Sequence, residues 1–323
     1  MPYTLRAMFP ALCLALILPC SSVLAADPAQ DKDAKPAETP AERAALPSRS
    51  QEDATALERR VPAAEQQQLQ AGDEHFLALW KPANSDDPKG AVIIVPGSDE
   101  SPDWPIAVGP LRQKLPDVAW ASLSISMPDA ENDGVFARSA DAPAADEKPA
   151  ADKDKAKDAA DPAASAEAEA AATAAQAAAL AEQAKSRADR IFARIDSAVA
   201  YAQENKARSI VLLGHGTGAY WAARYMSDRP SPAVQRLVMV TAVDSGRDLP
   251  SLLDVLPTLK VATADFVNKD RATSRQRAQE RLDASKRLKN LHFTQVGLSA
   301  IPGNPAMEQD QLFRRVRGWL ESE

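Results

Sequence analysis

One stretch, residues 209–226, constrains the fold of this chain more than any other. It begins with an apolar run, Ile210 to Leu213, and passes through a glycine-dense turn, Gly214-His215-Gly216-Thr217-Gly218. Small and apolar residues then recur at helical spacing, at Ala219, Ala222, Ala223 and Met226. This order predicts a buried strand, a sharp turn and a helix packed closely on the sheet.

Further apolar runs alternate with helical patterns along the chain. The run Ala91 to Val95 is continuous, which is typical of a strand buried on both faces, and it ends in Pro96-Gly97-Ser98. Other strands are predicted at residues 75–80, 120–126, 236–241, 258–263 and 292–298, with helices at 106–115, 191–202, 269–289 and 313–320. The alternation predicts an α/β fold with a mainly parallel sheet flanked by helices.

The N-terminus has the features of an export signal. Arg6 precedes an apolar segment, Ala7 to Pro19, that is too short to span a bilayer comfortably, and Ala25 closes a small-residue cleavage site. We therefore expect residues 1–25 to be a signal peptide and the protein to be periplasmic, with no transmembrane helix after cleavage. The alternatives are a short membrane anchor or a lipoprotein signal at Cys20, where Pro19 replaces the small residue such signals need.

Composition restricts the partners. The formal net charge is −7, and a uniformly acidic chain is not built to hold nucleic acid or an anionic membrane by charge. Both cysteines, Cys13 and Cys20, fall within the expected signal, which leaves no disulfide and no cysteine nucleophile after cleavage. Residues 26–52 have hardly a large apolar side chain and are expected to be a disordered leader, with the structured domain covering 53–323.

A low-complexity insert interrupts that domain at residues 130–186. Residues 140–162 consist of Ala, Asp, Lys and Pro without periodicity, whereas Ala163 to Ala184 is a strong helix former with almost no face to bury. Beyond it a stripe that includes Ile191, Ile195 and Val199 predicts packing on the sheet. The insert is read as a tolerated loop insertion, with a partner-binding arm as the alternative.

These elements, with the motifs at Pro96-Gly97, Gly214 to Gly218 and residues 317–320, resemble the α/β-hydrolase superfamily. More narrowly, the chain resembles an uncharacterised, exported proteobacterial branch of it, a domain of unknown function often degenerate at the turn. The resemblance implies a nucleophile elbow, G-x-S-x-G, at residues 214–218. It also implies that no lid domain follows the strand after the elbow, because the interval up to Leu256 is short.

The catalytic triad of that superfamily is carried over incompletely. Gly216 stands where the nucleophilic serine would be, and Asp265 matches the acid, expected in a loop after the strand ending near Thr263. The base should follow the last strand, between Ser299 and Ala306, where the chain has no histidine. Since nucleophile and base act as a unit, the loss of either removes most of the rate.

No other residue set in the sequence predicts chemistry. Thr217 is displaced by one position from the nucleophile, and Ser98 has no base visibly placed for it. No spacing of His, Asp and Glu resembles a metal site, and the glycine-rich turn lacks the phosphate-loop pattern, so neither metal nor cofactor is expected.

The oxyanion side of the site remains. We expect a pocket formed by Pro96, Gly97, Ser98, His215, Gly216 and Thr217, in which the Thr217 amide opens a helix that favours an anion or a carbonyl oxygen. The sequence therefore predicts a non-catalytic binding protein of the cell envelope for a small carbonyl or carboxylate ligand. Two alternatives stay open: a weak serine-type hydrolase with a displaced nucleophile, and a scaffold acting through the alanine-rich insert.

Overall fold

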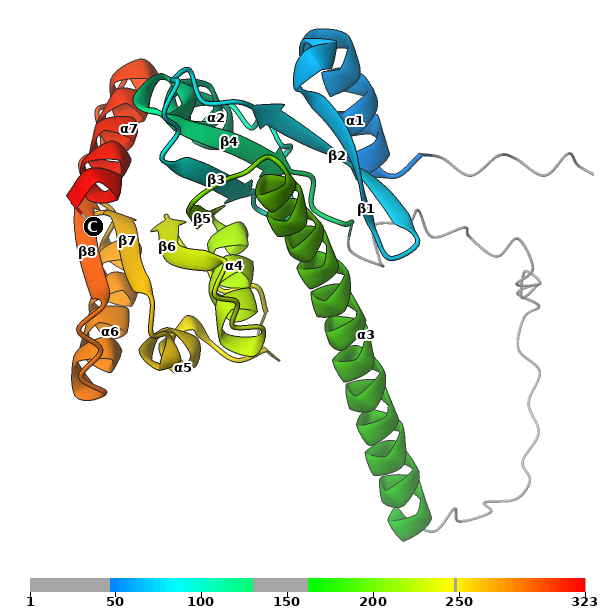
Figure 1. Cartoon of the computed structure of the whole chain (residues 1–323). Helices are drawn as coiled ribbons and strands as arrows, with labels where there is room; N and C mark the ends of the chain where they lie inside the picture. The colour runs from blue at the N-terminus through cyan, green and yellow to red at the C-terminus, as the bar shows by residue number, and fades with distance from the viewer. Residues whose placement is uncertain (1–46, 130–161, 247–248, 323) are drawn as a thin grey trace, which may run out of the picture. The chain divides into compact units, whose positions relative to one another are not determined.

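The computed structural model describes residues 47–129, 162–246 and 249–322, and the expected signal peptide and most of the leader lie outside them. Its centre is an eight-stranded sheet in the order β1-β2-β4-β3-β5-β6-β7-β8 (Figure 1). The strands are β1 (Gln66–Ala71), β2 (Glu74–Lys81), β3 (Gly90–Val95), β4 (Trp120–Ile125), β5 (Ile210–His215), β6 (Val234–Val240), β7 (Ala262–Asn268) and β8 (Phe293–Leu298).

The strands from β3 to β8 pair in parallel, whereas β1 and β2 form an antiparallel hairpin that joins the sheet through β4. The three central strands β3, β4 and β5 are buried along their whole length. Such burial is expected of the apolar runs in β3 and β5, whereas β4 also buries Ser122 and Ser124, whose hydroxyls donate to the carbonyls of Arg112 and Pro102. The predicted α/β class is thus confirmed. The strand β1 was not predicted, because its sequence, QQQLQA, lacks apolar alternation.

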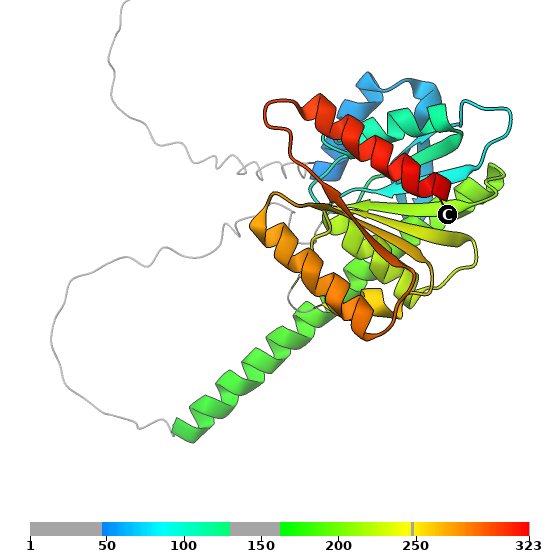
Figure 2. The ribbon, with the colours of Figure 1, turned by 90° about the vertical axis from the view of Figure 1, so that its left-hand side faces the viewer.

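Helices cover both faces of the sheet (Figure 2). On one face lie α2 (Val108–Lys114) and α7 (Pro305–Ser322), packed on side chains such as Val92, Ile94 and Leu213, and α1 (Arg49–Arg60), whose Leu57 packs with Leu77 and Leu79 of β2. On the other lie α3 (Pro162–Glu204), α4 (Thr217–Asp228), α5 (Leu252–Val255) and α6 (Ala272–Arg287). Because alternate residues of each strand point to opposite faces, the two larger apolar clusters form on opposite faces, and both include residues of the strand β5 that carries the elbow.

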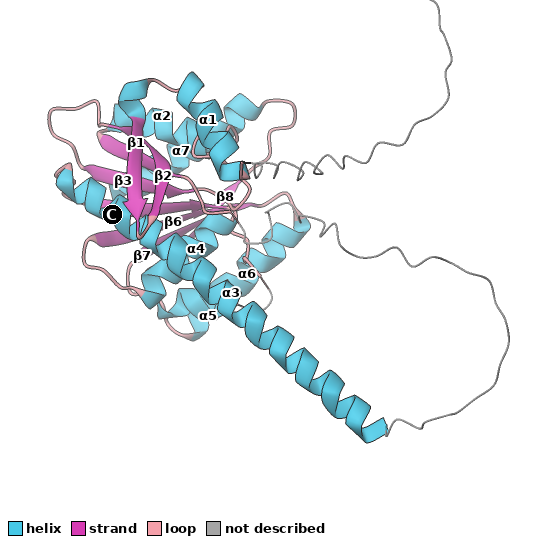
Figure 3. Ribbon diagram, turned by 90° about the vertical axis from the view of Figure 1, so that its right-hand side faces the viewer, coloured by secondary structure: helices cyan, strands magenta, loops and turns pink. Residues whose placement is uncertain are grey.

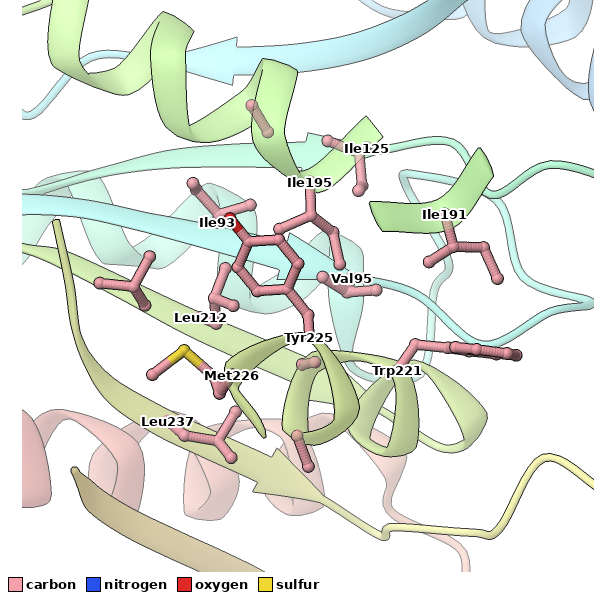
Figure 4. Packing of buried hydrophobic residues seen from close by; sticks show 14 of the residues in the cluster. Ile93, Val95, Ile125, Ile191, Ile195, Leu212, Trp221, Tyr225, Met226 and Leu237 are labelled. Atoms are coloured by element: carbon pink, nitrogen blue, oxygen red, sulfur yellow. The ribbon is translucent and has the colours of Figure 1, made fainter. Parts of the chain in front are cut away.

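The larger cluster fixes α3 and α4 on the sheet. Ile191 and Ile195 of α3 and Trp221 of α4 meet strand residues such as Ile93 and Leu212 (Figure 4). The predicted stripe of α3 is therefore buried. The preceding part of the same helix is different, since the side chains of residues 173–183 are exposed, and this part extends beyond the sheet in Figure 3.

Several predicted boundaries differ from the structure. The last helix, α7, begins at Pro305 and not at residue 313. The helix α1 begins at Arg49, not near Asp53, because Ser48 and Gln51 form a capping box there. The predicted strand at residues 258–263 is wrong: residues 256–258 form a 3₁₀ turn, η3 (Leu256–Thr258), and β7 begins only at Ala262. The described residues between β6 and β7 contain only α5 and η3. Of the expected low-complexity segment 140–162, residues 140–161 lie outside the described residues.

Candidate functional site: a nucleophile elbow without a nucleophile

The turn between β5 and α4 has the backbone of a nucleophile elbow. Gly216 has φ 56° and ψ −121°, a conformation that is costly for a residue with a side chain and open to glycine. Its amide donates to the Val240 carbonyl at 3.0 Å, and its own carbonyl accepts from the Val243 amide at 3.0 Å. Both bonds tie the turn to the end of β6, so the elbow is held although no nucleophile is present.

The three glycines of the turn serve different purposes. A Cβ on Gly214 would lie 2.3 Å from the Cα of Ala219, and one on Gly218 would lie 2.1 Å from the Val95 carbonyl oxygen. These two positions must be glycine because the backbones of β3, β5 and α4 approach closely. A Cβ on Gly216 would meet nothing nearer than Oε1 of Glu100, at 4.0 Å. Space for a side chain therefore exists at the nucleophile position.

The loop after β3 closes over the elbow through Ser98. The Ser98 amide donates to Oγ1 of Thr217 at 2.8 Å, and the two hydroxyl oxygens lie 3.1 Å apart. In the expected oxyanion hole this amide would point at the substrate oxygen. The structure places Ser98 beside Thr217. The side chain of Thr217, however, accepts from the Ser98 amide, which is one of the two backbone donors expected in the oxyanion hole.

Two arginines hold the same serine from other helices. Arg187 of α3 donates to the Ser98 hydroxyl at 3.1 Å, and Arg49 of α1 donates to the Ser98 carbonyl. Asp129, which lies in the loop after β4, accepts hydrogen bonds from Ser50. Its carboxylate lies 3.6 Å from the guanidinium group of Arg49. Burial opposes ionisation of Asp129, yet the bonds from Ser50 and Ser48 and the charge of Arg49 hold its pKa below the usual value.

A carboxylate that the sequence analysis missed faces the elbow. Glu100 accepts the Gly97 amide at 2.7 Å, and its two oxygens lie 2.7 and 2.8 Å from Nδ1 of His215. Both side chains are largely buried, at 14% and 11% exposure, so the pair is partly shielded from water. The only sequence signal was an acid two residues after Ser98, in the loop that reaches the elbow.

His215 is thus oriented by Glu100 through Nδ1. No residue in the described ranges bonds to its Nε2, which leaves that atom available to a ligand. The other two histidines do not join this pair: His75 is exposed in β2, and His292 is exposed just before β8. The loop that follows β8, from Ser299 to Asn304, has no histidine.

Asp265 is not in a loop, and that prediction is corrected. It lies in the middle of β7 with its side chain fully buried, where Oδ2 accepts from Arg281 at 2.9 Å and from Gln295 at 3.1 Å. Burial raises the pKa of this carboxyl group above its usual value, although Arg281 and Gln295 act in the opposite direction. The error arose because the strand was predicted too early in the sequence.

No group of three or more His, Cys, Asp or Glu that could hold a metal ion occurs among the described residues. In the same part of the chain, no helix is long and apolar enough to cross a membrane.

The strand order, the antiparallel β2 and the elbow after β5 together define an α/β-hydrolase fold. The chain belongs to the DUF3530 family, described as proteins of unknown function, which it matches over residues 9–322. No curated protein matches the sequence.

Solved structures with similar folds include hydrolases of low sequence identity. A dienelactone hydrolase from Anabaena variabilis is 15% identical, with a TM-score of 0.52 over 80% of this chain and 98% of that chain. An esterase from Pyrococcus furiosus is 12% identical, with a TM-score of 0.51 over 80% and 90%. Est1E from Butyrivibrio proteoclasticus is 9% identical, with a TM-score of 0.51 over 80% and 98%. At these identities the likeness concerns the fold alone.

Proposed function

We propose that this protein is a non-catalytic α/β-hydrolase-fold protein that binds a small ligand at its elbow. The observation that carries the proposal is Gly216, which keeps the elbow conformation and has room for a side chain but provides no nucleophile. The bond between the Ser98 amide and Thr217 supports it, because that amide would otherwise stabilise an oxyanion.

The site favours a neutral carbonyl group over a carboxylate. Thr217 is the first residue of α4, so its amide has no acceptor within the helix and lies at a helix N-terminus, which favours an oxygen ligand in the space at Gly216. The carboxylate of Glu100 borders the same space and would repel a second negative charge. Of the two ligand classes expected from the sequence, an ester or amide carbonyl therefore fits better.

The proposal places this protein in the periplasm. Its support is the N-terminal sequence, in which Arg6 precedes the apolar segment Ala7 to Pro19 and Ala25 closes a cleavage site. The intact mass of protein isolated from the periplasm tests this. The expected mass corresponds to a chain that starts at Ala26, whereas a mass that includes residues 1–25, or a lipid adduct, contradicts it.

Two assays test the absence of catalysis. Wild type and Gly216→Ser are compared for hydrolysis of short-chain nitrophenyl esters and for labelling by a fluorophosphonate. We expect neither protein to exceed background, because Ser98 cannot donate to an oxyanion and no histidine follows β8. Stoichiometric labelling of wild type would refute the proposal by revealing a nucleophile elsewhere. If only Gly216→Ser gains activity, a base already reaches the elbow, and His215 is the first to examine.

Ligand binding is tested with matched pairs of a small amide and the corresponding carboxylate, titrated by calorimetry. Wild type should prefer the amide, and Glu100→Gln should reduce that preference by removing the repulsion of the carboxylate. Gly216→Trp should abolish binding of both by filling the space above the elbow, while its thermal melt reports whether the fold is kept. A ligand bound equally well by wild type and Gly216→Trp would show that the elbow is not the site.

One observation favours a second candidate function, that of a scaffold. The side chains of residues 173–183 in α3 are exposed along a helix that continues into the core, so this segment could carry a partner. Removing it should leave ligand binding at the elbow unchanged but abolish any complex recovered from cells. If the deletion has no effect on complexes, the scaffold function is refuted.

A further inference from the structure

The turn between α6 and β8 combines exposed leucines with cations. Leu291 is 91% exposed and Leu288 is 66% exposed, the two highest values among the large apolar side chains of the described residues. Three cations precede the two leucines or lie between them: Lys286, Arg287 and Lys289. The side chains of all three are exposed. We call residues 286–292 the basic leucine turn.

This turn is held firmly by its backbone. The Lys289 amide donates to the Lys286 carbonyl at 3.0 Å, and Lys289 has a positive φ of 54°. The side chain of Asn290 donates to the carbonyls of Leu256 and Leu259, at 3.1 and 3.2 Å. The leucines are therefore presented by a fixed turn, and their exposure follows from the direction in which the backbone places them.

The charges of the turn are not neutralised by the rest of the protein. Within the described ranges, none of Lys286, Arg287 and Lys289 forms an ion pair. The nearest acid on the same helix is Asp283, whose carboxylate accepts from Gln279 and whose backbone carbonyl accepts from Arg287. Asp254 of α5, the helix packed beside α6, is bonded to Ser251. A local excess of positive charge thus stands on a chain of net charge −7.

A pocket of about 600 Å³ lies beside the turn, at the same edge of the sheet. It is lined by residues that include Met226, Pro232, Leu259 and Val261, and Lys260 adds a fourth cation to its wall. Because Asn290 bonds to the Leu259 carbonyl, the turn and the pocket are parts of one surface. That surface is at the amino-terminal ends of β7 and β8, opposite the elbow, so it is independent of the proposed ligand site.

We propose that the basic leucine turn and Lys260 bind the surface of an anionic lipid bilayer. Exposed leucines enter the boundary between headgroups and acyl chains, while neighbouring lysines and arginines pair with anionic headgroups. A nucleic acid would use the cations but not the leucines, and an apolar protein groove would use the leucines but not the surrounding charge. An anionic membrane uses both features of this turn.

Flotation of the full chain with vesicles tests the proposal. Vesicles of phosphatidylcholine alone are compared with vesicles that also contain phosphatidylglycerol, at low and high salt. Binding should require the anionic lipid and weaken with salt. Each substitution Lys286→Gln or Lys289→Gln should lower the partition coefficient about fivefold. The double variant Leu288→Ser/Leu291→Ser should lower it about tenfold or more.

Matched controls separate this surface from general stickiness. Ile106→Ser removes another exposed apolar side chain, 62% exposed, and Arg277→Gln removes another exposed cation of α6. Neither should change binding. Binding that is equal on neutral and anionic vesicles, or that survives the double leucine substitution, overturns the proposal.

Amide hydrogen exchange locates the contact independently of the apolar N-terminal segment. With anionic vesicles, exchange of residues 286–292 should slow, while exchange of the β1–β2 hairpin should not change. If vesicles leave exchange of the basic leucine turn unchanged, the membrane proposal is refuted.

Discussion

Substituting alanine for each glycine of the elbow in turn would test whether the vacant nucleophile position is imposed by packing. The structure predicts an unequal result. At Gly218 a Cβ would lie 2.1 Å from a carbonyl oxygen, and at Gly214 it would lie 2.3 Å from a backbone Cα. Real Cβ atoms do not approach so closely, and backbone atoms cannot move aside like the end of a side chain. Each substitution should cost about 3 kcal/mol or more of the free energy of unfolding.

Gly216→Ala should cost less, because the nearest atom is 4.0 Å away and only the backbone conformation is strained. A residue with a side chain at φ 56° and ψ −121° should lose about 1 to 2 kcal/mol. Gly216→Ser should behave similarly, with some compensation if its hydroxyl donates to Glu100. The elbow would therefore accept a nucleophile in energetic terms.

Three glycines elsewhere in the chain serve as controls. Gly72 and Gly303 have positive φ values of 59° and 78° with nothing within 4 Å of a Cβ, so alanine there measures backbone strain alone. Gly318, within α7, has neither constraint, and Gly318→Ala should stabilise the protein by about 0.5 to 1 kcal/mol. Urea unfolding gives the midpoint and the slope for each variant. Equal losses at Gly216 and Gly218 would refute the argument, because they would mean that the elbow is closed at its centre.

Three further predictions follow from contacts away from the elbow. Arg281→Leu should cost about 3 to 5 kcal/mol of the free energy of unfolding, because it leaves Asp265 buried without its cation. Adding Asp265→Leu should restore much of that loss in urea unfolding. A double variant as unstable as Arg281→Leu would contradict this. Burial opposes ionisation of Glu74, but Arg194 and Arg190 lower its pKa below the usual 4.5, so its contribution to stability is present above pH 4.5 and is lost as the pH falls through the lowered pKa. Thermal melts at decreasing pH should therefore show a smaller loss in Glu74→Gln than in wild type, and parallel curves would exclude the ion pairs as the cause. Removing residues 163–184, whose described side chains are almost all exposed, should change the melting temperature by only a few degrees, and a loss of the cooperative transition would mean that this segment packs on the domain.

The fold could be predicted because its signals are local. The central strands β3 and β5 contain continuous apolar runs, and the elbow can be recognised from glycines whose spacing reflects the close approach of β3, β5 and α4. The amphipathic part of α3 was likewise visible from the stripe through Ile191 and Ile195. Where the hydropathy pattern of a segment agrees with its burial, the sequence is sufficient to predict the helix or strand.

The polar contacts of the site could not be predicted in the same way. Glu100 contacts the elbow only because the loop after β3 folds back on β5. Glu100 and its partner His215 are more than a hundred positions apart in the chain. Asp265 was misplaced for a related reason: a carboxylate inside a strand is unexpected until Arg281 and Gln295 are seen to satisfy it. Both cases depend on side chains from other elements, and hydropathy does not report such partners.

The missing serine is one of several linked departures from a hydrolase site. A serine introduced at Gly216 would still lack an oxyanion donor while the Ser98 amide is bonded to Thr217, and it would face Glu100 in place of a free imidazole. Releasing Ser98 would in turn require breaking its contacts with Arg49 and Arg187, which come from α1 and α3. We therefore expect the single substitution Gly216→Ser not to create a hydrolase. The contacts that hold Ser98 connect the loop after β3 to the helices α1 and α3, so a change at Gly216 alone leaves this loop in place.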